Sequence, residues 1–148
     1  ITTAQAFHWF NVNLFKSECI RILKPNGKVF LIWNLRDNSS EMTQKCFDIY
    51  KKYCPKFKGF GGGIQKDDIR IKEFFADKYE YLEYENPLFY DKETFISRSL
   101  SGSYSLKSND EGFDEYVAEL KELFDEYAVD GIISMSNKTV VYMGIVKE

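Results

Sequence analysis

The stretch RILKPNGKVFLIWN, residues 21–34, decides the fold class of this 148-residue chain. Residues 24–27 (KPNG) stop a preceding helix, because proline has no amide hydrogen to donate and asparagine and glycine accept turn geometry. The apolar residues 29–33 follow without alternation, which predicts a strand buried on both faces, as in a parallel sheet. A helix, a tight turn and a buried strand are half of a βαβ unit, so the sequence predicts an α/β protein.

The helix before this turn should cover residues 11–23. Its apolar face consists of Val12, Phe15, Cys19, Ile22 and Leu23. Asn11 is suited to the N-cap, because its side chain can accept a hydrogen bond from a first-turn amide. The strand that opens the βαβ unit would then have to end within residues 1–4.

Periodicity predicts the remaining elements. We expect helices over residues 38–53, 67–76, 91–100 and 110–128, and strands over residues 79–85 and 138–146. Asn38 and Glu41 have the spacing of a capping box, and Gly131 is placed to end the last helix. The chain shows no internal repeat or interdomain linker, so residues 1–148 are expected to belong to one domain.

The composition argues against several classes of function. A net charge of −3 with dispersed lysines and arginines gives no footprint for nucleic acid or an anionic membrane, so neither is an expected partner. No apolar run approaches the roughly 20 residues that cross a bilayer. The three cysteines form no CxxC pair, which indicates a reducing cytoplasm and argues against disulfides or a zinc site. With a single histidine, no metal centre is expected.

The glycine-rich sequence GFGGG, residues 59–63, lacks the context of a phosphate-binding loop. Such a loop is delivered by a strand and followed at once by a helix, whereas this one follows a helix and Pro55. We interpret it as a surface connection that could act as a flap, and an autonomous nucleotide site there is a third hypothesis. No GxSxG elbow is present for a nucleophilic serine.

The sequence AQAFHWF, residues 4–10, contains the only histidine, His8. Loops after the carboxyl ends of parallel strands are where α/β sheets bind ligands. If a strand ends near Ala4, residues 5–10 form one such loop, and residues 34–37 (NLRD) form its neighbour. The residue types alone favour neither of two interpretations: His8 and Trp9 could form a packed aromatic corner, or they could line a ligand pocket.

Residues 4–10 and residues 21–28 (RILKPNGK) resemble two motifs of the class I S-adenosylmethionine-dependent methyltransferases called type 11. The first resembles the end of the family's fourth strand with its following loop, and the second resembles the R-x-L-K-P-G-G turn into strand five. The similarity is greatest to the trans-aconitate methyltransferase-like branch, which residues 100–104 (LSGSY), 123–124 (LF) and 139–144 (TVVYMG) also resemble.

The departures from this pattern concern both detail and extent. Asn11 stands where the family usually has aspartate, and Asn26 where it usually has glycine. Nothing resembles the glycine-rich loop after strand one or the acidic residue that ends strand two. The resemblance therefore implies a partial Rossmann-like methyltransferase sheet, the region of strands four to seven with flanking helices, without the N-terminal cofactor-binding half.

The resemblance also implies a site. The implied contacts with S-adenosylmethionine, at its methionine end, are Gln5, Ala6 and Phe7. His8 and Trp9 would be catalytic residues on the acceptor side, with His8 able to accept a proton. The implied contacts with a small-molecule acceptor are Asn34, Arg36, Ser103 and Tyr104. Arg36 could clamp a carboxylate, because its planar guanidinium matches that group.

Since Ile1 is not a start residue, we expect a C-terminal fragment of a cytoplasmic methyltransferase, inactive alone and with little cofactor binding. An unpaired sheet edge where the absent strands belong would favour a homodimer. The alternative hypothesis is a stand-alone α/β interaction or dimerisation module without catalysis, in which the aromatic corner is only core.

Overall fold

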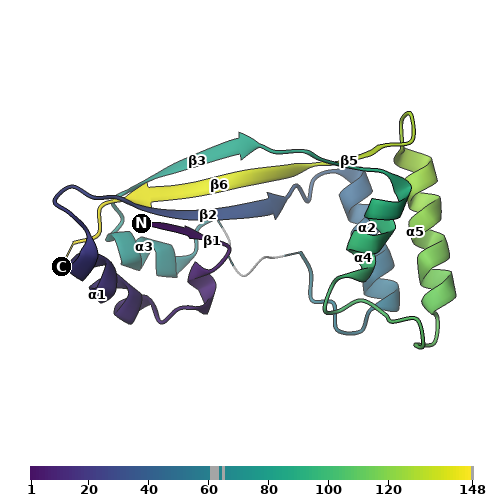
Figure 1. Cartoon of the computed structure of the whole chain (residues 1–148), viewed down its shortest axis with the longest axis horizontal. Helices are drawn as coiled ribbons and strands as arrows, with labels where there is room; N and C mark the ends of the chain where they lie inside the picture. Colours follow the sequence, from purple (N-terminus) through teal and green to yellow (C-terminus); the bar gives the residue numbers. More distant parts are fainter. Residues whose placement is uncertain (61–63, 65, 148) are drawn as a thin grey trace. The chain divides into compact units, whose positions relative to one another are not determined.

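The structure, a computed structural model, describes residues 1–60, 64 and 66–147, and the chain divides into two compact units. Unit 1 comprises Ile1–Leu35, Gly61–Glu85 and Lys138–Glu148, and unit 2 comprises Arg36–Phe60 and Asn86–Asn137. Each unit has its own hydrophobic core. Both contain helices and strands, so the α/β prediction is confirmed at the level of a mixed fold (Figure 1).

Unit 1 is built on a four-stranded sheet with the order β1-β2-β6-β3. The strands are β1 (Thr2–Ala4), β2 (Val29–Arg36), β3 (Tyr79–Glu85) and β6 (Asn137–Gly144). β1 and β2 are parallel, with Thr3 opposite Leu31, whereas β3 and β6 are antiparallel, with Leu82 opposite Val141. All four strands were expected from the sequence, including the short one before the first helix.

Helix α1 (Val12–Ile22) connects β1 to β2 and completes the predicted βαβ unit. It begins where the sequence predicts, because the Asn11 side chain accepts a hydrogen bond from the Leu14 amide at 3.1 Å. Helix α3 (Ile69–Phe75) lies with α1 on the same face of the sheet (Figure 1). A single-turn 3₁₀ helix, η1 (Phe7–Trp9), lies between β1 and α1.

The two faces of β2 differ in burial. Val29, Leu31 and Trp33 are fully buried in the core that α1 and α3 complete. Phe30 and Ile32 point to the opposite face, because side chains alternate along a strand, and they are only half buried. Within unit 1, burial of this strand is therefore complete on one face and partial on the other.

Unit 2 combines three helices with a two-stranded antiparallel sheet. Its elements are α2 (Glu41–Tyr53), α4 (Lys92–Leu100), α5 (Phe113–Tyr127), β4 (Leu88–Tyr90) and β5 (Ile133–Met135). α5 packs against both α2 and α4. The core is rich in aromatic rings, since Tyr50, Phe95, Tyr116 and Phe124 are all at most 3% exposed.

Several predicted details of unit 2 are wrong. α2 begins at Glu41 with Ser40 at its N-cap, so Asn38 and Glu41 form no capping box. α5 ends at Tyr127, before Gly131. Asp130 and Gly131 instead have φ of 50° and 75° in a two-residue turn closed by the Val129–Ile132 bridge. Positive φ at both central positions is the geometry of a type I′ turn, which Asp-Gly favours.

Two further expectations concern the whole chain. In the part that the structure describes, no helix is both long and apolar enough to span a membrane. Residues 61–63 of the glycine-rich sequence lie outside the described residues, so the flap and the nucleotide site stay predictions.

Candidate active site

In unit 1, β1 ends beside Ile32 of its parallel neighbour β2, two residues before Asn34. Ala4 is opposite Ile32, and the Gln5 amide continues the ladder by donating to the Ile32 carbonyl at 2.9 Å. The chain then leaves the sheet as η1, while β2 continues to Arg36. The loop containing His8 therefore begins beside the carboxyl half of its neighbouring parallel strand, near the edge where α/β sheets bind ligands.

Gln5 has a strained backbone at this edge. Its φ of 52° is in the left-handed region, which costs a non-glycine residue about 1–2 kcal/mol. The side chain of Gln5 donates from Nε2 to the Asn34 carbonyl at 3.3 Å, and both residues are exposed. Strained residues that the fold holds in place are concentrated at functional sites, so this pair is a candidate ligand contact.

Phe7 is a core residue. Its side chain is fully buried and makes edge-to-face contacts with Phe15, Trp33 and Phe74, at ring-centroid distances of 6.1, 6.2 and 5.2 Å. The interpretation of this loop as packed core thus holds for Phe7. Any contact with a cofactor would have to come from its backbone or from half-buried Ala6, whose carbonyl accepts from the Trp9 amide at 2.9 Å.

His8 is half buried and is oriented by Trp33. The indole Nε1 of Trp33 donates to Nδ1 of His8 at 3.4 Å. An indole nitrogen can only donate, so this contact fits an imidazole whose Nδ1 accepts and whose Nε2 donates. A base that acts through Nε2 would need the other tautomer, which offers Trp33 no acceptor.

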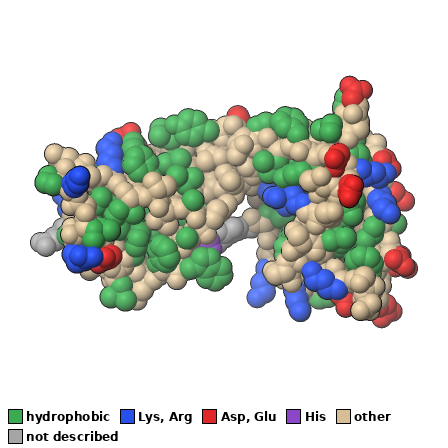
Figure 2. Space-filling model, viewed as in Figure 1, with side chains coloured by type: hydrophobic (Ala, Val, Ile, Leu, Met, Phe, Trp, Pro, Cys, Tyr) green, Lys and Arg blue, Asp and Glu red, His purple; other side chains and the backbone are tan. Residues whose placement is uncertain are grey.

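Trp9 is the most exposed large apolar side chain of this loop, at 80%. Its ring lies 4.9 Å from the His8 ring. Phe10 and Leu14 are also exposed, at 41% and 71%. Figure 2 shows the only histidine at the surface beside hydrophobic side chains. Exposed apolar groups that cluster around a polar one are typical of binding sites.

Arg36, the last residue of β2, belongs to unit 2. Its guanidinium carbon lies 4.0 Å from the centroid of the Phe60 ring. Among the described residues, buried Nη1 has no hydrogen-bond partner and no carboxylate is ion-paired with this arginine. A buried N–H of a charged group without a partner is costly, and an anionic ligand would satisfy it.

Tyr104 shares the environment of Arg36 within unit 2. Its ring is half buried between Tyr50 and Phe57, at centroid distances of 5.4 and 4.9 Å. Burial raises the pKa of the Tyr104 phenol, and the positive charge of Arg36 opposes that rise. The neighbouring Ser103 is exposed. The structure therefore brings Arg36 and Tyr104 into one electrostatic environment.

The sequence analysis missed two aromatic partners at these positions, Trp33 and Phe60. A signal existed for Trp33, because a buried indole N–H needs an acceptor and His8 is the one imidazole. None existed for Phe60, which lies far from Arg36 in the sequence. Among the described residues, no group of three or more His, Cys, Asp or Glu side chains could hold a metal ion.

Sequence comparisons find relatives for part of this chain. No family model matches the chain. Two curated proteins of Schizosaccharomyces pombe match part of it. An uncharacterized methyltransferase is 46% identical over 52 residues, which are 35% of this chain and 21% of the relative. An uncharacterized methyltransferase-like protein is 42% identical over 60 residues, which are 38% of this chain and 23% of the relative.

A solved structure extends the likeness to nearly the whole chain. A candidate type II methyltransferase from Anaeromyxobacter dehalogenans has a TM-score of 0.54 over 98% of this chain and 63% of that one, at 12% identity. The chain thus spans less than two thirds of that structure, and the matched segments cover about a quarter or less of the curated relatives. These relatives support a methyltransferase-related function, and the sheet with flanking helices is similar to a methyltransferase structure.

Proposed function

We propose that the chain is the C-terminal part of an S-adenosylmethionine-dependent methyltransferase of the trans-aconitate methyltransferase-like branch, acting on a small-molecule acceptor in the cytoplasm. The observation that carries the proposal is the βαβ unit β1-α1-β2. Gln5, directly after β1, is bonded to Asn34 of β2, and His8 is held by Trp33 in the following loop. The relatives named methyltransferases support the reaction class.

The edge of β1 supports a division of the cofactor site between this chain and further strands. β1 is the end strand of the sheet. Ile1 and Gln5 direct their backbone groups to β2, since the Ile1 carbonyl accepts from Phe30 and the Gln5 amide donates to Ile32. Backbone groups alternate sides along a strand, so those of Thr2 and Ala4 point outward, ready to pair with another strand. On this proposal the chain alone binds the cofactor weakly and is inactive.

S-adenosylmethionine would supply an activated methyl group, and the residues of this chain would position the reactants and exclude water. Gln5, with its neighbours Ala6 and Phe7, would contact the methionine end of the cofactor. The exposed side-chain amides of Gln5 and Asn34 suit the methionine end of the cofactor. Each amide has a donor for a carboxylate and an acceptor for an ammonium group. Trp9 would cover the acceptor side.

His8 would act as a hydrogen-bond donor from Nε2 in this proposal, because Trp33 occupies Nδ1. A donor at that position can hold an acceptor oxygen during methyl transfer. Proton acceptance by His8 is therefore the less favoured of its two proposed roles.

Arg36, Ser103 and Tyr104 remain proposed acceptor contacts in unit 2. The buried Nη1 of Arg36, which has no hydrogen-bond partner in the described part of the chain, favours an acceptor that carries a carboxylate. The Tyr104 phenol beside it could supply a further hydrogen bond.

The test uses the complete protein that contains this sequence. Calorimetric titration with S-adenosylhomocysteine should show binding, and the isolated chain should bind far more weakly. His8→Ala should lower turnover more than cofactor affinity. His8→Gln is the matched control, because its Nε2 retains a donor, and it should keep more turnover than His8→Ala. Absence of cofactor binding by the complete protein would overturn the proposal.

The second candidate, an interaction or homodimerisation module, is favoured by the outward backbone groups of Thr2 and Ala4. Thr2→Pro removes one outward N–H without touching the bonds to β2, and proline is tolerated at edge strands. Sedimentation of the chain should show a dimer that Thr2→Pro weakens. A strictly monomeric chain would refute pairing through this edge, and it leaves the cofactor test unaffected.

A further inference from the structure

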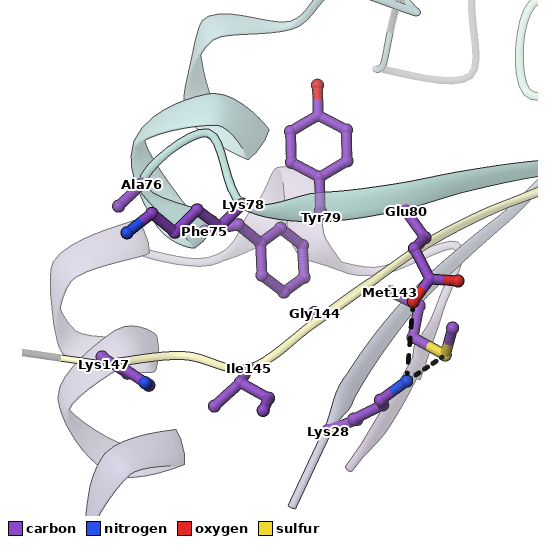
Figure 3. Close-up of a pocket in the computed structure, with 10 residues that line it drawn as sticks. All are labelled: Lys28, Phe75, Ala76, Lys78, Tyr79, Glu80, Met143, Gly144, Ile145 and Lys147. Carbon is purple, nitrogen blue, oxygen red and sulfur yellow. Dashed lines mark hydrogen bonds and ion pairs between the residues drawn. The ribbon is translucent and has the colours of Figure 1, made fainter. Parts of the chain in front are cut away.

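We propose that unit 1 carries a second binding site, for an organic carboxylate with an aromatic body, at the end of the sheet opposite Gln5 and Asn34. A cavity of about 540 Å³ lies there, where β2 and β3 begin and β6 ends (Figure 3). Its volume is within the range of small-molecule sites, roughly 300–1,000 Å³. The proposal does not depend on the proposed methyltransferase function.

The wall of this cavity is apolar and aromatic. Phe75 and Tyr79 contribute rings whose centroids are 5.7 Å apart, and Met143 and Ile145 line it from the end of β6. Phe75 is only 2% exposed and belongs to the core, so this wall is held firmly. The Met143 thioether in the lining suits an aromatic ligand, because sulfur and aromatic groups attract one another.

The backbone around the cavity is constrained by the fold. Ala76 and Asp77, between α3 and β3, have φ of 50° and 57°, an uncommon pair of left-handed residues without glycine. This turn brings Phe75 and the Lys78 carbonyl against Gly144. A Cβ on Gly144 would lie 2.7 Å from the Phe75 ring and 2.9 Å from that carbonyl oxygen, so the close approach requires glycine. The cavity wall is therefore part of the packed structure.

The rim is positively charged. Among the described residues, Lys28, Lys78 and Lys147 line the cavity with one carboxylate, Glu80. These four side chains together carry a net charge of +2, on a chain of net charge −3. Nζ of Lys28 lies 3.7 Å from both the Glu80 carboxylate and the Met143 sulfur, and these long contacts leave it able to bind an anion (Figure 3). Within the described part of the chain, Lys78 and Lys147 have no ion pair.

Lysines from three segments line this cavity together with aromatic and aliphatic side chains, and this lining selects the class of ligand. An ammonium group binds an anion as a point charge and does not impose the bidentate geometry of arginine. A carboxylate can therefore be held at the rim while its aromatic body occupies the wall. A neutral molecule of the same shape would lose the electrostatic attraction of the lysines. An inorganic anion would lose the apolar contacts with the wall.

The test follows Met143 in the chain by the NMR signals of its methionine methyl groups. The other two methionines, Met42 and Met135, are buried in the core of unit 2 and serve as internal references. Titration with 3-phenylpropionate should move the Met143 signal alone. The neutral isostere 3-phenylpropanamide should bind at least about fivefold more weakly, and inorganic phosphate should bind more weakly still.

Variants of the rim lysines separate charge from packing. Lys78→Gln and Lys147→Gln should each weaken 3-phenylpropionate binding about two- to fivefold, because both amines are exposed. Lys24→Gln, an exposed lysine outside the cavity, should leave binding unchanged. Three results would each overturn the proposal: an unmoved Met143 signal, equal affinity for acid and amide, or phosphate binding as tightly as the acid.

Discussion

Units 1 and 2 build their cores from different materials. In unit 1 a sheet strand supplies Val29, Leu31 and Trp33, and two helices cover that face. In unit 2 three helices enclose several tyrosines, and burial raises the pKa of Tyr50 and Tyr116, as it also does for Tyr142 in unit 1. The buried side-chain atoms without a hydrogen-bond partner belong to Arg36, Thr43 and Asn137, all in unit 2, among the residues that the structure describes.

This difference separates packing from polar function. Apolar burial stabilises a fold without regard to direction, whereas a buried polar group stabilises it only when its partner is in place. The stability of unit 1 should therefore depend mainly on side-chain volume, and that of unit 2 also on charge and on bound ligand.

The largest effect should come from the aromatic corner of unit 1. Phe7→Ala should lower the free energy of unfolding by about 3–5 kcal/mol, since the ring is fully buried. Trp9→Ala, two residues away and 80% exposed, should change it by no more than about 0.5 kcal/mol. Urea denaturation followed by circular dichroism measures both. Equal losses would contradict the assignment of Phe7 to the core and Trp9 to the surface.

The next effect compares glycines of the two units. Gly144→Ala should destabilise by about 1–3 kcal/mol, because its Cβ would collide with Phe75 and with backbone. Gly131→Ala has no atom within 4 Å of the new Cβ, so only its left-handed backbone, φ 75°, opposes the change. Its cost should be about 1 kcal/mol. A larger loss for Gly131→Ala, measured by the same denaturation, would reverse the order.

Asp68, the N-cap residue of α3 in unit 1, makes the stability of this unit depend on pH. It accepts from the Arg70 amide at 2.9 Å and from the Arg70 guanidinium at 2.9 and 2.6 Å, and these bonds hold its pKa below the usual value. Because the folded pKa is depressed, the contribution to stability is present above the ordinary carboxyl pKa and is lost as pH falls through the folded value.

Asp68→Ala should therefore cost about 1 kcal/mol at neutral pH and progressively less in acid. Urea midpoints measured from neutral pH downward test this. Asp67→Ala is the matched control. The Asp67 carboxylate is exposed and its ion pair with Lys72 is long, at 3.7 Å, so this variant should lose less stability. A pH-independent loss for Asp68→Ala would exclude the ionised carboxylate as its cause.

The smallest effect is expected at Arg36. Arg36→Met removes a guanidinium nitrogen to which the described residues supply no partner, and also the contact with the Phe60 ring, two changes of opposite sign. The free energy of unfolding, measured by thermal denaturation, should therefore change by no more than about 1 kcal/mol in either direction. Arg98→Met is the control, since Arg98 is exposed and lies 5.4 Å from the Tyr90 ring. A loss well above that size would indicate an anionic partner for Arg36.

The elements predicted well from the sequence are those with a strong local signal. β3 has its predicted limits, and α1 begins at the Asn11 cap. β4, β5 and η1 were missed, because three residues are too few for periodicity. The turn at residues 130–131 did carry a signal, since Asp-Gly favours the turn that joins two strands. Asn38 was wrongly assigned as a cap because Ser40, two residues later, competes for that position.

The strand pairing beside the candidate site was predictable, and its side-chain contacts were not. The order of a buried strand and a preceding helix implies a parallel strand before residue 5, and the pairing of β1 with β2 confirms that strand. The burial of Phe7 and the bond from Trp33 to His8 depend on how rings pack between elements 25 residues apart. No spacing rule encodes that packing.

The three cysteines give each unit a built-in chemical reporter. Cys19 lies in the core of unit 1 and Cys46 and Cys54 in that of unit 2, all free and at most 1% exposed. Burial raises the pKa of the Cys19 and Cys46 thiols, and an alkylating reagent attacks only the accessible thiolate. Mass spectrometry of alkylated peptides at increasing urea would thus show which half of the molecule opens first.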